Sequence, residues 1–234
     1  TSITIPSTVS SIGNGAFSST LGLTYITVDS NNTNYKDIDG VLFNKDGTTL
    51  IQYPIGNTRT SYEIPSTVTN VESSAFYATS NVTTIAIPAK VQTIGDGAFS
   101  RMTGLTEITV NDSNTNYKAI SGVLFDSSGA TLIQYPASNT SMTSYVIPSG
   151  VTIIAQSAFF QAQNLTSITI PEGIEKIETY TFYATSKLTS INIPASVTNI
   201  SSYAFLASGL ATITFAEGSK LINIDFGTFQ STKL

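Results

Sequence analysis

Histidine, cysteine and tryptophan are absent from this 234-residue sequence, and charged residues make up only 11% of it. Without histidine and cysteine the chain lacks the commonest metal ligands, the thiol nucleophile and the general base that titrates near neutral pH. Carboxylates, lysine and tyrosine remain, which disfavours most enzyme classes. The composition therefore argues against most kinds of catalytic site.

Basic residues are also scarce: the sequence has 10 basic and 15 acidic residues, and its net charge is −5. This balance gives no electrostatic reason to bind phosphate groups, so we expect neither nucleic acid nor an anionic membrane as a partner. No apolar run approaches the roughly 18 to 20 residues that span a bilayer. The lack of cysteine suits a reduced cytosol or a bacterial surface protein without disulfides, and the Ser, Thr, Asn and Gly content favours an extracellular location.

A repeated unit runs through the chain and is aligned by Pro6, Pro65, Pro88, Pro148, Pro171 and Pro194. It reads I-x-I-P-x-x-V-x-x-I-x-x-x-A-F-x-x-x-x-x-L-x-x, with a spacing of 23 residues between the last three prolines. Such a period is typical of a solenoid. The chain opens within this pattern, without a starting Met, and closes within it, so we expect residues 1–234 to be a single solenoid from a longer protein.

Each column of the unit has an expected role. The I-x-I segment alternates as a short strand, with Ile turned to the core, and the proline ends it. A second apolar run and one tight helical or 3₁₀ turn around the Phe are expected to follow. The recurring Phe predicts a column of stacked rings, formed by Phe17, Phe76, Phe99, Phe159, Phe182, Phe205 and Phe229.

Two longer segments, 29–61 and 111–144, interrupt the repeat. Both contain Gly-Val-Leu-Phe and Thr-Leu-Ile-Gln-Tyr-Pro on either side of a polar turn, which predicts an inserted β-hairpin module. The tip changes from Asn44-Lys45-Asp46-Gly47 to Asp126-Ser127-Ser128-Gly129, so its charge is not kept between the copies. We therefore do not expect partners to dock on the tips.

These residues resemble the BspA-like, Treponema-type leucine-rich repeats of surface proteins; the unit from Ile168-Thr169-Ile170-Pro171 to Phe182 follows that pattern almost column for column. The chain departs from it where Ala-Thr or Ala-Gln stands in place of Gly-Cys after the Phe. The resemblance implies a right-handed, curved leucine-rich-repeat superhelix of α/β type, rich in β. It also implies a secreted or surface-anchored protein that acts in adhesion, with no activity and no cofactor.

Alternation places one set of strand residues towards solvent, where we expect a continuous ladder. As a binding face, the ladder would offer an extended polar surface to a partner. Alternatively, it would have only a structural role, since Thr and Ser suit exposed strand positions. It holds a single aromatic side chain, whereas binding hot spots favour Trp, Tyr and Arg. The candidate partner-binding residues are Tyr25, Thr27, Ser61, Glu63, Thr84, Glu107, Thr109, Ser144, Ser167, Thr169, Ser190, Asn192, Thr212 and Thr214.

Acidic and amide groups are the remaining candidates for metal or catalytic sites. The loop Asp29 to Tyr35 is rich in oxygen ligands, but the positions where an EF-hand needs Gly and Glu hold Asn34 and Gly40. We predict turns capped by asparagine and no metal. Asp37 and Asp39 of the first insert become Ala119 and Ser121 in the second, which argues against a carboxylate pair for glycoside hydrolysis.

The sequence therefore predicts a non-enzymatic surface protein that binds a protein or glycan, such as a component of the host extracellular matrix or another cell. Two alternatives remain open. One is a carbohydrate-processing enzyme of β-helix type, which would need carboxylates aligned on neighbouring strands. The other is a passive spacer on the cell surface.

Overall fold

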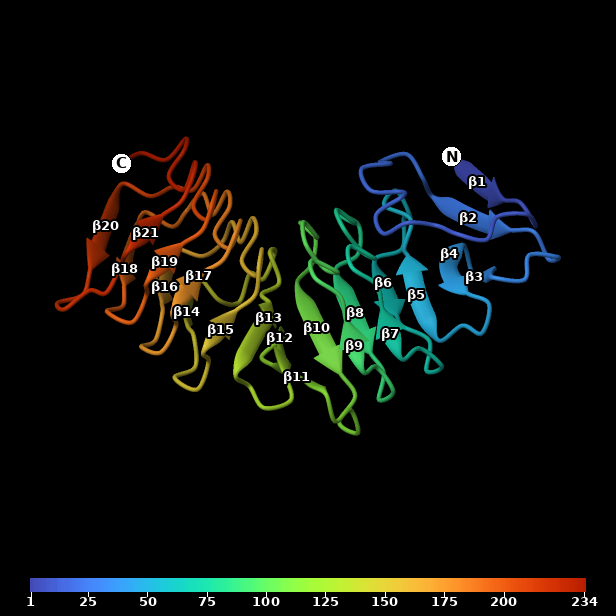
Figure 1. Cartoon of the computed structure of the whole chain (residues 1–234), viewed down its shortest axis with the longest axis horizontal. Helices are drawn as coiled ribbons and strands as arrows, with labels where there is room; N and C mark the ends of the chain where they lie inside the picture. Colours follow the sequence, from blue (N-terminus) through green and yellow to red (C-terminus); the bar gives the residue numbers. More distant parts are fainter. The chain divides into compact units, whose positions relative to one another are not determined.

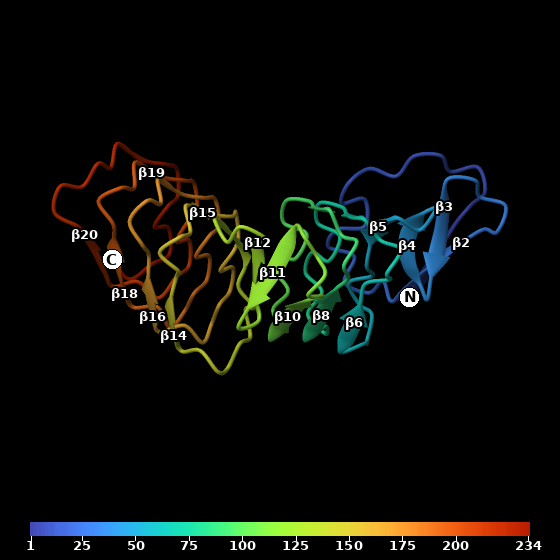
Figure 2. The ribbon, with the colours of Figure 1, turned by 90° about the horizontal axis from the view of Figure 1, so that it is seen from below.

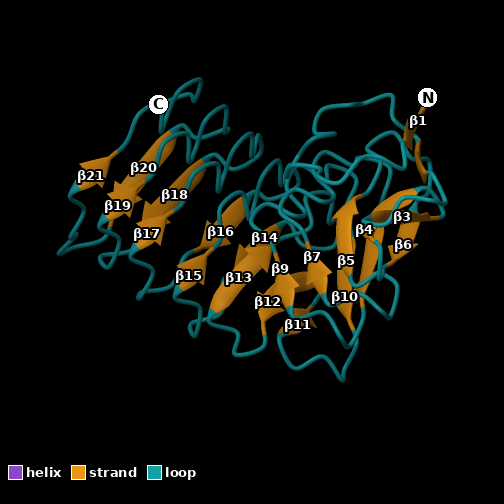
Figure 3. Ribbon diagram, turned by 45° about the vertical axis from the view of Figure 1, so that its right-hand side comes forward, coloured by secondary structure: helices purple, strands orange, loops and turns teal.

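The computed structural model describes all residues 1–234 and consists of short strands joined by turns, with no helix (Figures 1 and 3). Two compact units divide the chain, residues 1–118 and residues 119–234. Each unit is a stack of coils, as a solenoid requires. The expected helical component is therefore wrong, whereas the expected stacked repeats are confirmed.

The first side of each coil is a strand before the proline. These strands pair in parallel one repeat apart, so that Ile85 of one coil lies beside Ile108 of the next. Most of their Ile residues are buried because alternate strand residues face opposite sides, whereas Ile3 of β1 is exposed. In unit 1 they are β1 (Ser2–Ile5), β2 (Tyr25–Val28), β6 (Ser61–Glu63), β8 (Thr84–Ile87) and β10 (Glu107–Val110); in unit 2 they are β14 (Ser144–Val146), β16 (Ser167–Thr169), β18 (Ser190–Ile193) and β20 (Thr212–Phe215).

The second side is a two-residue strand at the second apolar run. In unit 2 the pairs β17–β19 and β19–β21 are parallel, with Ile177 beside Ile200 and Ile200 beside Ile224. The repeated Ile thus places an apolar side chain on the same level of every coil. The members are β7 (Asn70–Val71), β9 (Thr93–Ile94), β15 (Ile153–Ile154), β17 (Lys176–Ile177), β19 (Asn199–Ile200) and β21 (Asn223–Ile224).

The third side, around the Phe, forms turns where a helical turn was expected. The N–H of Tyr77 donates to the carbonyl of Ser74 in its own coil at 3.0 Å, whereas the N–H of Phe76 donates to Ala98 in the next coil at 2.8 Å. Ser74 and Ala78 also have φ near +61° and +62°. Because every second donor bonds to the neighbouring coil, and because left-handed residues flank the Phe, a helix cannot propagate here.

Aromatic rings fill the core as stacks. In unit 2 the centroids of Phe159 and Phe182 are 5.2 Å apart, those of Phe182 and Phe205 are 5.1 Å apart, and those of Phe205 and Phe229 are 5.6 Å apart. In unit 1 Phe76 and Phe99 stack at 5.4 Å, while Phe17 packs on a separate cluster of buried residues near the N-terminus. The predicted ring column is therefore confirmed except at Phe17.

The inserts continue the ring stacks with tyrosine, which sequence reasoning missed. Tyr53 stacks on Phe76 at 5.2 Å and Tyr135 stacks on Phe159 at 5.1 Å. Each tyrosine hydroxyl has a partner, since Tyr53 bonds to the Asn57 amide oxygen and Tyr135 donates to the Met142 carbonyl. The shared Gln-Tyr-Pro of the two inserts was the sequence signal for this position.

The inserts are not separate hairpin modules. Antiparallel pairing joins β3 (Tyr35–Ile38) to β4 (Val41–Asn44), and β4 to β5 (Thr49–Gln52). However, β5 then pairs in parallel with β7, so its strand belongs to the second side of the solenoid. The second insert contains β11 (Tyr117–Ile120), β12 (Val123–Asp126) and β13 (Thr131–Gln134), and β13 likewise pairs in parallel with β15. An antiparallel turn was predicted, but its integration into the coil was not.

Candidate functional site

The candidate partner-binding residues all lie on first-side strands, with exposed side chains except for half-buried Thr84. They do not form one continuous ladder. Hydrogen bonding divides the strands into the sheets β1–β2, β6–β8–β10, β14–β16 and β18–β20. In unit 1 the insert causes the break, because the Ile26 N–H of β2 donates to the Gly40 carbonyl of the insert at 3.0 Å.

The widest of these exposed faces belongs to the sheet β6–β8–β10, whose strands lie side by side in Figure 2. Across it, Ser61, Thr84 and Glu107 form one row, and Glu63, Ala86 and Thr109 form the next. We call these six residues the three-strand face. Two carboxylates, three hydroxyls and one methyl group therefore point to the same side.

The two carboxylates of this face are at opposite corners. Glu63 and Glu107 lie on strands separated by β8 and differ by two residues in register. With strands about 4.8 Å apart and a rise of about 3.3 Å per residue, their Cα atoms are about 12 Å apart. The two glutamates are therefore not aligned on neighbouring strands, as the hydrolase alternative would need.

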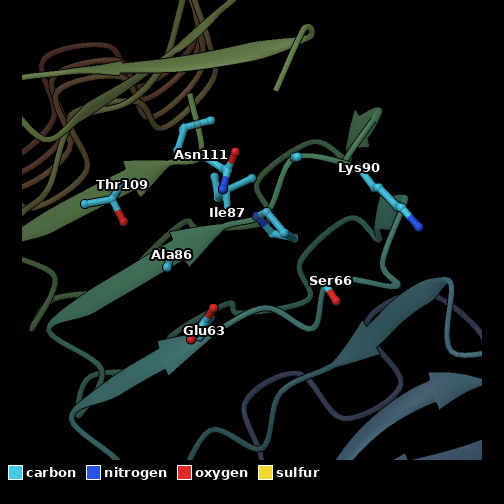
Figure 4. Close-up of a pocket in the computed structure, with 10 residues that line it drawn as sticks. Glu63, Ser66, Ala86, Ile87, Lys90, Thr109 and Asn111 are labelled. Atoms are coloured by element: carbon cyan, nitrogen blue, oxygen red, sulfur yellow. The ribbon is translucent and has the colours of Figure 1, made fainter. Parts of the chain in front are cut away.

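A groove opens where these strands end (Figure 4). Its volume is about 380 Å³, which lies within the range of small-ligand sites. In Figure 4 Glu63 lies at the bottom and Lys90 at the upper right, with Ala86 and Thr109 to the left and Asn111 above. The remaining lining residues are Ser66, Ile87, Pro88, Ala89 and Val110.

Sequence reasoning missed most of this groove. The ladder contributes Glu63 and Thr109, but Ser66, Lys90 and Asn111 come from the segments that follow each strand. The signal was present in the repeat, because each first-side strand ends at a proline or a polar turn and the next residues must bend around its end. The three-strand face and this groove share Glu63, Ala86 and Thr109 and are therefore continuous within unit 1.

The oxygen-rich loops next to this surface serve as turns. The side-chain amide of Asn114 donates to the carbonyls of Pro88 and Val91 at 2.8 and 3.2 Å. Its oxygen accepts the N–H groups of Asn116 and Tyr117 at 2.8 and 2.9 Å. Asn32 makes the equivalent four bonds in the first copy. The predicted asparagine-capped turns are therefore confirmed. The structure also brings no three His, Cys, Asp or Glu side chains together as a metal centre.

Tyr25, the only aromatic candidate, has a structural contact. Its ring lies against Gly40, where an added Cβ would come within 2.3 Å of the ring. Gly40 has a φ of +81° in the turn between β3 and β4. The ring of Tyr25 therefore covers the insert turn, although 41% of the residue remains exposed.

The acid at the tip of the second insert is also structural. Burial alone would raise the pKa of Asp126, but hydrogen bonds from Thr131, Ser128, Gly129 and Ala130 outweigh it and lower the pKa. In the first copy the Asn44 oxygen accepts the N–H groups of Thr48 and Thr49, both at 2.9 Å. Both tips use their polar side chain to close the turn.

The first-side strands of unit 2 present smaller faces. Ser144 lies beside Ser167 and Val146 beside Thr169 on one pair of strands. On the other pair, Ser190 lies beside Thr212 and Asn192 beside Thr214, whose hydroxyl donates to the Asn192 oxygen at 2.9 Å. These faces carry no charged side chain.

Stacked coils whose strands pair in parallel from one repeat to the next place the chain among leucine-rich-repeat-type solenoids. The family model for the BspA type leucine rich repeat region matches residues 56–144 and 131–234, with six copies, and the chain belongs to this family. No curated protein sequence matches the chain.

Solved structures of bacterial repeat proteins are similar. A leucine-rich repeat protein from Eubacterium ventriosum is 29% identical over 88% of this chain and 58% of its own, with a TM-score of 0.53. A leucine rich cell surface protein from Faecalibacterium prausnitzii is 25% identical over 97% and 79%, with a TM-score of 0.56. The pneumococcal vaccine antigen PcpA is 22% identical over 92% and 56%, also with a TM-score of 0.56, and shows the fold alone. The chain thus spans little more than half the length of the first and the last.

Proposed function

We propose that this chain is a ligand-binding segment of a bacterial cell-surface protein and that its partner is a protein or a glycan. Membership of the BspA-type repeat family supports a repeat protein for molecular interaction. The likeness to a leucine rich cell surface protein supports the surface location. No helix long and apolar enough to cross a membrane is present.

The observation that carries the proposal is the three-strand face and the groove at its end. Glu63 belongs to both, so a ligand along the face can also enter the groove of about 380 Å³. Carboxylates at two corners of the face and Lys90 in the lining of the groove offer polar partners for hydroxyl, amide or ammonium groups. At one edge of the groove, the Asn114 amide bonds to the carbonyls of Pro88 and Val91.

The test begins with a binding screen of the whole chain against host matrix proteins and a panel of glycans. For a partner found in the screen, a Glu63→Gln and Glu107→Gln double variant should weaken binding at least about fivefold, because both carboxylate hydrogen bonds change. A matched control, Asp46→Asn with Asp96→Asn, removes the same charge from exposed positions of unit 1 and should leave binding unchanged.

Equal binding by the face variant and the wild type would place the partner elsewhere. A chain that binds nothing in the screen would favour the passive spacer. Release of sugars or peptides from any probe would revive the enzyme alternative, which the separation of Glu63 and Glu107 disfavours.

A further inference from the structure

Two open seams interrupt the hydrogen bonding between coils of unit 2, although no insert separates the strands there. The prolines Pro148, Pro171 and Pro194 are 23 residues apart, so the repeat is unbroken. Even so, β16 does not bond to β18 on the first side, and β15 does not bond to β17 on the second side. We call these gaps the first-side seam and the second-side seam. Both border residues 165–188, which we call the seam coil.

The first-side seam differs from the boundary one coil earlier. There, the N–H groups of Thr166 and Ser167 both donate to the Thr143 carbonyl, at 2.8 and 3.4 Å. One coil later the corresponding N–H groups belong to Thr189 and Ser190 and the corresponding carbonyl to Thr166, but no hydrogen bond joins them. The first-side faces β14–β16 and β18–β20, which follow one another in Figure 2, are therefore not linked by a backbone ladder.

The second-side seam lies between β15 and β17, on the other boundary of the seam coil. At the next boundary, the N–H groups of Thr198 and Ser201 donate to the carbonyls of Glu175 and Ile177, at 2.8 and 2.9 Å. The corresponding bonds from Glu175 and Glu178 to the preceding coil are not formed. A groove of about 380 Å³, lined by residues of both strands, lies there instead. The missing bonds therefore coincide with an opening between the coils.

The third side is closed at both boundaries. The Phe159 N–H donates to the Thr181 carbonyl at 3.0 Å, and the Phe182 N–H donates to the Ala204 carbonyl at 2.8 Å. The rings of Phe159, Phe182 and Phe205 also stack without a break. The seam coil is therefore attached to the preceding coil by its first and third sides and to the following coil by its second and third sides. By contrast, the coils of β18 and β20 are bonded to each other on all three sides.

One carboxylate bridges the two coils at the end of the first-side seam. Glu172 of the seam coil is exposed and accepts the N–H groups of Ala195 and Ser196 in the following coil, both at 3.0 Å. The Ser196 hydroxyl donates to the Ile174 carbonyl at 2.8 Å and accepts the Gly173 N–H at 3.0 Å. Because these bonds lie at an exposed corner, where water competes for the same groups, they hold the coils less firmly than a ladder would.

We propose that the seam coil is a hinge within unit 2 and that Glu172 is its latch. The coils on its two sides turn about the closed third side, and the first-side faces β14–β16 and β18–β20 change their angle as the first-side seam opens or closes. This motion breaks no ladder hydrogen bond at either seam, so its free energy is low. A partner that lies along both faces selects the angle that fits it. The hinge does not depend on the three-strand face, which lies in unit 1.

The first test compares distance distributions across the hinge and away from it, since a chain without cysteine accepts spin labels at chosen sites. Labels at Ser127→Cys and Glu217→Cys span the seam coil. Labels at Asp46→Cys and Asp112→Cys span the paired second-side strands β5, β7 and β9 of unit 1, and all four positions are exposed. Pulsed electron paramagnetic resonance should give a broader distribution for the first pair.

The latch is tested with the same labels. Glu172→Ala should broaden the distribution across the seam coil further, because it removes the bonds to Ala195 and Ser196. Glu178→Ala is the matched control, since its carboxylate pairs with Lys176 of its own coil, and it should leave the distribution unchanged.

A disulfide across the first-side seam should lock the hinge. Ser167→Cys with Ser190→Cys bridges the seam, and Ser144→Cys with Ser167→Cys bridges the bonded pair β14–β16 at the same column of the repeat. Oxidation of the first pair should slow hydrogen exchange of the Thr189 amide at least about tenfold, because a closed seam lets it donate to the Thr166 carbonyl. Oxidation of the second pair should leave this rate unchanged.

Equal widths for the two label pairs would overturn the hinge, as would equal exchange of the Thr189 amide in the two oxidised variants. An unchanged width in Glu172→Ala would overturn the latch. Urea unfolding curves establish that each variant is folded before its distances and exchange rates are compared.

Discussion

Replacing Phe182 by alanine should destabilise the protein strongly, because this ring is enclosed on both faces. It is fully buried and stacks on Phe159 at 5.2 Å and on Phe205 at 5.1 Å. Loss of the buried ring costs about 2 to 3 kcal/mol in transfer free energy. The cavity left between two fixed rings adds about 1 to 2 kcal/mol, so we expect the free energy of unfolding to fall by about 4 kcal/mol.

Phe229 provides the comparison within the same unit. It stacks on one ring only, Phe205 at 5.6 Å, and is partly exposed. Phe229→Ala should cost about 1 to 2 kcal/mol, since part of its ring already contacts water. In a solenoid, stability comes from contacts between adjacent coils, so a ring with one neighbour contributes less than a ring with two.

Urea unfolding followed by circular dichroism and by tyrosine emission measures both losses, since the chain has no tryptophan. Phe182→Leu is the control that keeps most of the apolar volume and should lose about half as much as Phe182→Ala. Equal losses at positions 182 and 229, or a loss below about 1 kcal/mol at 182, would refute the argument that enclosure by two rings sets the cost.

Three further expectations concern turns, close packing and pH. Asn114→Ala should lower the free energy of unfolding by about 2 to 3 kcal/mol, because it leaves buried backbone groups without partners. Asp112→Ala, at an exposed position of the same loop, should change it little. Similar losses for the two variants in a urea titration would contradict the capping role. Gly209→Ala should destabilise the protein by about 1 to 3 kcal/mol, because its Cβ would come within 2.1 Å of the Ser186 carbonyl oxygen. Gly150→Ala has open space around it and should be neutral or stabilising. Thermal melts that rank the two variants in the opposite order would contradict this argument. Burial raises the pKa of the Tyr145 hydroxyl from 10.0 to about 12. The unfolded chain therefore loses this proton at a lower pH than the folded chain. The stabilisation is fully present below pH 10, and the free energy of unfolding falls by up to about 3 kcal/mol as the pH rises to 12. Alkaline unfolding of Tyr145→Phe should show a shallower decline, and an unchanged slope would assign the loss to other groups.

The repeat alone determined much of this protein. The period of 23 residues, the inward Ile and the Phe column were predictable because they recur from coil to coil, and the asparagine turns because they recur in both inserts. Strand alternation also assigned the exposed residues, Glu63 and Glu107 among them, since successive side chains of a strand must face opposite sides. The family followed from the same columns.

Only the tertiary structure decided which N–H groups and strand edges pair with a neighbouring coil. The Phe turns are not helical because their N–H groups bond to the next coil, as Phe76 does to Ala98, and a single coil does not reveal that choice. The insert strand β5 joins the second side of the solenoid because β7 offers it an edge, and Tyr53 then enters the ring stack. The groove by Lys90 and the two seams beside the seam coil arise in the same way. Their residues are distant in sequence and become neighbours only when coils stack in one register.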